Sequence, residues 1–255
     1  MIRQLPIIIP VALLLISPTF GMEDRSFDSD GVKIRYTIDG AGEPVILVHG
    51  SRASGGLNWR MPGIVGRLAE KYQVITMDCR GHGKSDQPGP GAYGVKMVDD
   101  VVRLMDHLKL DTAHIAGYSM GGMITIKMLA NHPERLRSAT ICGMGWMNAA
   151  DDSARNISAE AGQDRYANSV NQFGDLAITE TELKAIDVPM TIIVGDEDGL
   201  YDRRVKPMVA VRKDIPVVLI EGANHMTCVF DDSFREAVRI EIDKHAAKSA
   251  GTKRD

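Results

Sequence analysis

The chain has 255 residues, of which 44% are hydrophobic and 25% are charged, and this length suffices for one sizeable α/β domain. Its formal net charge of −4, with no long basic run before the C-terminal tail at 248–254, argues against a nucleic-acid partner. The three cysteines are widely spaced without a C-x-x-C pattern, so no disulfide framework is indicated.

The first 21 residues differ in kind from the rest. A short positive start, Met1–Gln4, precedes the almost wholly apolar stretch Leu5–Phe20, and small residues lie where a signal peptidase would cleave. We interpret 1–21 as a secretory signal peptide, which predicts a secreted or periplasmic protein. Its short length and its prolines argue against a stable membrane-spanning helix. Two alternatives stay open: the segment is retained as an anchor, or Met22 is the true start and the protein is cytoplasmic.

Beyond the leader, strand-like and helix-like patterns alternate. Alternation of apolar and polar residues over 31–38 predicts a half-exposed strand at a sheet edge. Continuous apolar runs predict strands buried on both faces, and amphipathic stretches predict helices between them. The expected later strands are 44–48, 72–77, 113–116, 136–142, 189–194 and 216–220, and the expected helices are 62–72, 95–108, one ending at 131, 205–211 and 230–247. The pattern predicts the α/β class, with a mostly parallel central sheet and helices on both faces.

The most informative stretch joins a strand to a helix through Gly117-Tyr118-Ser119-Met120-Gly121, a G-x-S-x-G sequence. A serine at the tip of so sharp a turn has a strained backbone, so its neighbours must have almost no side chain. The first N–H groups of the helix then point at the space before the hydroxyl. The competing interpretation is a glycine-rich turn with a bystander serine, in a chain of 25 glycines.

Polar clusters follow the other buried strands, at the carboxyl ends where ligands gather in such sheets. They are His49-Gly50-Ser51-Arg52, Asp78-Cys79-Arg80-Gly81-His82-Gly83-Lys84-Ser85, Gly195-Asp196-Glu197-Asp198-Gly199 and Glu221-Gly222-Ala223-Asn224-His225. Together with the G-x-S-x-G turn, these motifs resemble the α/β-hydrolase fold family over nearly all of the chain after the leader.

The resemblance implies a role for each polar group. Ser119 attacks a carbonyl carbon, His225 takes its proton and passes it to the leaving group, and Asp198 orients the imidazole. The backbone N–H of Met120 stabilises the oxyanion, and relatives supply the second donor from the position of Ser51.

Several assignments have competitors. Asp196 and, less strongly, Asp202 compete with Asp198 for the acid. We expect His49 and His82 to hydrogen-bond the loops around the site, and Asp78 to brace its own loop by pairing with Arg80. No cluster has metal-ligand spacing and no nucleotide-binding motif is present, so we expect neither a metal nor a cofactor.

The segment 143–186 is polar, breaks the alternation of strands and helices, and corresponds to the lid of the family. Its shortness suggests an open cleft for a small or medium ester, lined by Trp59, Tyr118, Met144 and Trp146; ordinary packing of these side chains is the alternative.

The expected function is therefore hydrolysis of a small-molecule carboxylic ester through an acyl-enzyme. The alternatives are hydrolysis of a carbon–carbon bond, lactone opening or peracid formation with the same triad, or a ligand-binding protein without catalysis. The sequence does not give the oligomeric state.

Overall fold

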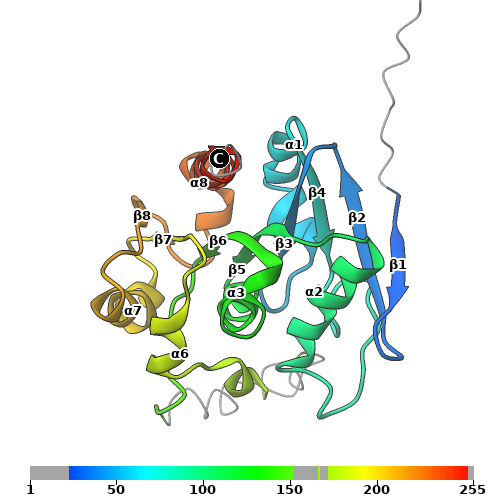
Figure 1. The fold of residues 1–255 in the computed structure, drawn as a ribbon, viewed down its shortest axis with the longest axis horizontal. Helices are drawn as coiled ribbons and strands as arrows, with labels where there is room; N and C mark the ends of the chain where they lie inside the picture. Colours follow the sequence, from blue (N-terminus) through cyan, green and yellow to red (C-terminus); the bar gives the residue numbers. More distant parts are fainter. Residues whose placement is uncertain (1–22, 152–165, 167–171, 252–255) are drawn as a thin grey trace, which may run out of the picture.

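The computed structural model describes residues 23–151, 166 and 172–251. The predicted signal peptide and much of the predicted lid therefore lie outside the described residues. The described chain forms an eight-stranded sheet in the order β1-β2-β4-β3-β5-β6-β7-β8 (Figure 1). Its strands are β1 (Arg25–Asp28), β2 (Lys33–Asp39), β3 (Glu43–Val48), β4 (Tyr72–Met77), β5 (Ala113–Tyr118), β6 (Leu136–Cys142), β7 (Met190–Gly195) and β8 (Val217–Ile220).

The sheet is parallel from β4 to β8, whereas β2 pairs antiparallel with both β1 and β4. This confirms the expected mostly parallel sheet but corrects its edge. The strand predicted at 31–38 is not at the edge, because β1 covers it. β1 has only four residues, Arg-Ser-Phe-Asp, of which Phe27 alone is buried, so it carries no readable alternation.

Helices cover both faces of the sheet (Figure 1). One face carries α2 (Lys96–His107), α3 (Met120–Asn131) and α7 (Lys206–Val211), and the other carries α1 (Ile64–Ala69) and α8 (Asp232–Gly251). The buried strands supply both layers, because successive side chains point to opposite faces. In β3, Ile46 packs with the α2 and α3 side and Leu47 with the α1 and α8 side.

The predicted lid begins directly after β6 and ends before β7. Its described part contains a helix that the sequence pattern did not reveal, α6 (Glu180–Ala185). Thr179 caps this helix by accepting a hydrogen bond from the N–H of Glu182, while the Glu182 carboxylate accepts the N–H of Thr179. No helix among the described residues is long and apolar enough to cross a membrane.

Candidate active site

Ser119 lies at a sharp turn between β5 and α3. Its backbone has φ 53° and ψ −111°, a conformation that a residue with a side chain adopts only under strain. The flanking glycines permit the turn through close packing. A Cβ on Gly117 would lie 2.1 Å from the carbonyl oxygen of Gly121, and a Cβ on Gly121 would lie 2.1 Å from that of Val48. The absence of side chains at these two positions is therefore required by the backbone itself.

The side chains of Ser119, His225 and Asp198 form one hydrogen-bonded chain. Nε2 of His225 lies 2.9 Å from Oγ of Ser119, and Nδ1 of His225 lies 2.7 Å from Oδ2 of Asp198. The Asp198 side chain is almost fully buried, whereas that of His225 is partly exposed. The second carboxylate oxygen of Asp198 accepts the N–H of Leu200 at 2.9 Å. Both carboxylate oxygens of Asp198 therefore have hydrogen-bond partners: one bonds to the imidazole of His225 and the other to the main chain of its own loop.

The two competing carboxylates have other partners. Oδ1 of Asp196 accepts the N–H of Gly222 at 2.8 Å, which ties the loop after β7 to the loop that carries His225. Asp202 forms an exposed ion pair with Lys206. Of the three candidates, Asp198 is the one in contact with the imidazole. Its catalytic role remains a prediction.

Two backbone N–H groups close to Ser119 are available as donors. Within the described residues, the N–H groups of Met120 and Ser51 have no acceptor in the protein. Met120 is the first residue of α3, where the helix leaves its N–H groups unpaired. The chain before Ser51 passes close to the nucleophile, since a Cβ on Gly50 would lie 3.3 Å from Cβ of Ser119. The family resemblance implied both donors, and their role as an oxyanion hole remains a prediction.

Two side chains hold the main chain of Gly50, one at its carbonyl oxygen and one at its N–H. The ring Nδ1 of His49 lies 2.7 Å from the carbonyl oxygen of Gly50, and Nε2 of His49 accepts the N–H of Cys79. Burial lowers the pKa of His49, so the ring stays neutral and keeps one donor and one acceptor. Oδ1 of Asn58 accepts the N–H of Gly50 at 2.7 Å. Asn58 lies in the short π-helix Gly56–Arg60 and belongs to no motif, so it was not predicted from the sequence.

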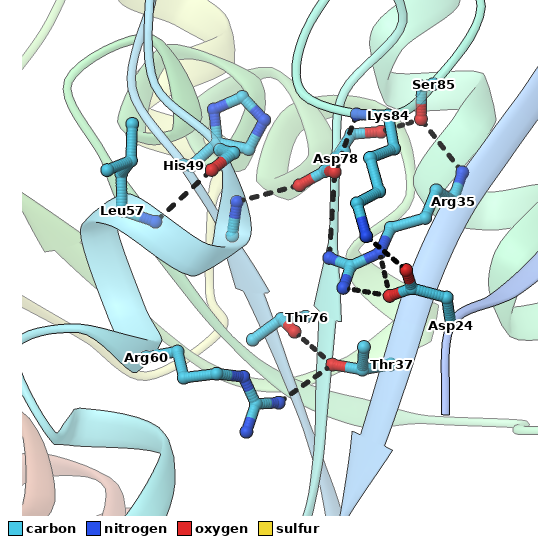
Figure 2. Close-up of polar contacts among 12 residues, drawn as sticks. Asp24, Arg35, Thr37, His49, Leu57, Arg60, Thr76, Asp78, Lys84 and Ser85 are labelled. Carbon is cyan, nitrogen blue, oxygen red and sulfur yellow. Dashed lines mark hydrogen bonds and ion pairs between the residues drawn. The ribbon is translucent and has the colours of Figure 1, made fainter. Parts of the chain in front are cut away.

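Asp78 is a second anchor of the loop after β3, and Figure 2 shows its polar contacts. Its two carboxylate oxygens accept the N–H of Gly55 at 2.9 Å and of Lys84 at 3.0 Å. Its ion-pair partner is Arg35, at 3.6 Å, and not Arg80 as expected. Asp78 therefore joins the loop after β3 to the loop after β4, and Arg35 of β2 balances its buried charge.

Arg80 instead forms a buried bidentate pair with Asp100 of α2, at 2.7 and 2.6 Å. Oδ1 of Asp100 also accepts the hydroxyl of Ser29, so the pair joins three segments of chain. Nδ1 of His82 lies 3.0 Å from the carbonyl oxygen of Arg80, and this contact agrees with the structural role expected for His82. Its ring also stacks, tilted, on Tyr166 of the lid at 4.8 Å between centroids.

The four side chains expected to line a pocket are all buried. Trp59 has no exposed surface and packs in the core layer beneath α1 and α8, so the structure favours the packing alternative for it. Met144 and Trp146 pack in the other layer, and Nε1 of Trp146 donates to the carbonyl of Ile178. Tyr118 is buried and its hydroxyl donates to the main-chain carbonyl oxygen of His225.

Comparison with known proteins gives the family and the fold. Residues 43–183 match the family described as the alpha/beta hydrolase fold. The chain is 32% identical over 130 residues to a 2-hydroxymuconate semialdehyde hydrolase of Pseudomonas sp. (strain CF600), covering 50% of this chain and 44% of that protein. It is 34% identical over 116 residues to the dihydrolipoyllysine-residue acetyltransferase component of the acetoin cleaving system of Cupriavidus necator. This match covers 45% of this chain and 30% of that protein. These matches span less than half the length of the curated relatives.

A solved structure extends the likeness to the whole fold. The enol-lactonase from Burkholderia xenovorans LB400 superposes with a TM-score of 0.70, covering 86% of this chain and 100% of that chain. At 22% identity this likeness concerns the fold alone.

Proposed function

This chain belongs to the alpha/beta hydrolase fold family, and from that premise we propose that it is a serine hydrolase that cleaves a small or medium carboxylic ester through an acyl-enzyme. The observation that carries the proposal is the continuous chain of hydrogen bonds from Asp198 through His225 to Ser119. A serine hydroxyl needs an adjacent base to attack a carbonyl, and a base held by a buried carboxylate meets that need.

The proposed reaction runs in two halves. In the first, Nε2 of His225 takes the proton of Ser119 as Oγ bonds to the ester carbonyl carbon, and the same proton then goes to the departing alcohol. In the second, His225 takes a proton from water as the water oxygen bonds to the acyl carbon, and it then returns that proton to Oγ of Ser119 as the bond to the acid breaks. Each half passes through an oxyanion that the N–H groups of Met120 and Ser51 would stabilise. Loss of one such donor costs about 3 kcal/mol in the transition state.

A second candidate reaction uses the same residues on a different bond. The relative from Pseudomonas is named for the hydrolysis of 2-hydroxymuconate semialdehyde, a compound whose name contains no ester. This favours carbon–carbon bond hydrolysis as the alternative to ester hydrolysis. Lactone opening needs no change in the proposed steps, because a lactone is a cyclic ester.

A series of p-nitrophenyl esters of increasing acyl length tests the proposal, with wild type compared with Ser119→Ala. We expect wild type to show an optimal acyl length and Ser119→Ala to lose turnover while it keeps its circular dichroism spectrum. Covalent labelling by a fluorophosphonate should follow the same pattern. Turnover that persists in Ser119→Ala would refute the serine mechanism, and labelling of Ser119 without any ester turnover would move the function to the second candidate.

We also propose that the protein is exported with removal of residues 1–21. N-terminal sequencing of the protein from its native host checks this directly. A chain that starts near residue 22 in an extracellular or periplasmic fraction is expected, and a cytoplasmic chain would contradict it.

A further inference from the structure

The loop that carries the histidine, residues 221–227 (the His loop), buries few of its side chains against the rest of the protein. Asn224, Met226 and Thr227 are exposed on it, and its internal hydrogen bonds run mainly to the side chain of Asn224. Such a segment has few buried contacts to fix it. Yet its histidine must stay within hydrogen-bond reach of both Ser119 and Asp198. The main chain of the loop therefore needs tethers from outside.

Tyr118 provides a tether at the histidine itself. Its hydroxyl donates to the main-chain carbonyl oxygen of His225 at 2.6 Å. The tyrosine is 4% exposed, and its ring lies edge-on to Phe234 of α8 at 5.8 Å between centroids. On another side it contacts Gly143 at the end of β6, where an added Cβ would lie 3.0 Å from the ring. Neighbours from two other elements thus fix the ring, and the hydroxyl has a defined position.

The contact between Tyr118 and His225 is made by the residue that directly precedes the nucleophile in the chain. Tyr118 and Ser119 are consecutive, and both side chains reach His225: the tyrosine holds its carbonyl oxygen and the serine meets its Nε2. The residue before the nucleophile therefore sets the distance between the main chain of the histidine and the nucleophile. The tyrosine and histidine rings also lie close, with centroids 5.6 Å apart.

We infer that Tyr118 is a positioning residue, whose hydroxyl fixes the His225 main chain so that the imidazole spans Ser119 and Asp198. The catalytic consequence rests on the proposed function, whereas the tether itself does not. Burial raises the pKa of Tyr118 well above its ordinary value, so the hydroxyl remains protonated and keeps donating across the working pH range.

Tyr118→Phe tests the inference, because it removes the hydroxyl and keeps the ring. A displacement of reacting groups by about 1 Å can cost about 100-fold in rate. We expect kcat to fall about 10- to 100-fold with KM changed less than about threefold, since the tyrosine side chain is buried.

Tyr72→Phe is the matched control. The hydroxyl of Tyr72 also donates at 2.6 Å, to Asp243, and its side chain is also buried, but it lies at the start of β4, at the opposite end of that strand from Asp78. This variant should lose a comparable hydrogen bond and keep wild-type kcat.

A spectroscopic readout separates the tether from turnover. In wild type, the Nδ1–H proton of His225 in its bond to Asp198 should give a downfield resonance. That resonance should broaden or vanish in Tyr118→Phe and persist in Tyr72→Phe. If wild type cleaves no ester, the proposed function fails, yet this comparison still decides the tether. A resonance as sharp in Tyr118→Phe as in wild type, or a kcat loss equal in both variants, overturns the inference.

Discussion

Replacing Asp198 by asparagine changes the site without changing its size. Both carboxylate oxygens accept hydrogen bonds, one from His225 and one from the N–H of Leu200. An asparagine has one oxygen acceptor and one NH₂ donor, so it can satisfy only one of the two partners. If its oxygen keeps Leu200, its NH₂ faces Nδ1 of His225. The imidazole then carries its proton on Nε2 and cannot accept the proton of Ser119.

The alternative rotamer of the amide is no better. It would set the NH₂ group against the N–H of Leu200, two donors at the former distance of 2.9 Å where the side chain is almost fully buried. We therefore expect the first orientation. A wrong tautomer in such a triad costs about 10⁴-fold in kcat, which corresponds to about 5.5 kcal/mol of transition-state stabilisation.

The assay is hydrolysis of the best p-nitrophenyl ester under saturating conditions, and Asp196→Asn is the control. Asp196 is exposed and accepts one hydrogen bond, from Gly222, which the asparagine oxygen can still accept. Its kcat should stay within about threefold of wild type, a change of about 0.6 kcal/mol. A greater loss in Asp196→Asn than in Asp198→Asn would refute the assignment of the acid.

Three further predictions concern stability. Asp100→Ala should lower the free energy of unfolding by about 3–5 kcal/mol in urea titration, because it leaves the buried guanidinium of Arg80 without its carboxylate; a loss below about 1 kcal/mol would contradict this. Gly121→Ala should cost about 1–3 kcal/mol in the same titration, since its Cβ would overlap the carbonyl of Val48. Burial lowers the pKa of His114, so the unfolded chain binds a proton there that the folded chain does not, and the free energy of unfolding should fall as the pH drops below about 6.5. His114→Gln should make that fall shallower, and equal slopes would contradict the assignment.

The sequence predicted most of the sheet because its central strands are buried on both faces. The strand predicted at 136–142 matches β6, and that at 72–77 matches β4. β1 escaped prediction because a four-residue strand with one buried side chain leaves no periodic pattern. The short helix α6 escaped for a similar reason, since its only fully buried residue is Leu183.

In the candidate site, too, residues that belong to a sequence pattern were predicted and residues outside any pattern were not. The sequence marked Ser119 through its flanking glycines, which the turn requires sterically. It left Asp196 and Asp198 as competitors for the role of the acid. The two carboxylates follow the same strand two residues apart, and only the conformation of the loop decides which of them faces the imidazole. The hydroxyl of Tyr118 and the amide of Asn58 could not be assigned at all. Their partners are main-chain atoms, which every residue possesses and no pattern reveals.

The residues of the candidate site lie far apart in the sequence, and this distance affects how the protein refolds. Ser119 and His225 are 106 positions apart, and β8, which precedes the His loop, lies at the edge of the sheet and pairs with β7. Contacts between distant positions form late, because closing the intervening loop costs entropy. After dilution from denaturant, most secondary structure should therefore return before reactivity toward a fluorophosphonate does. The rate at which that reactivity returns would then time the docking of the last strand and the helix that follows it.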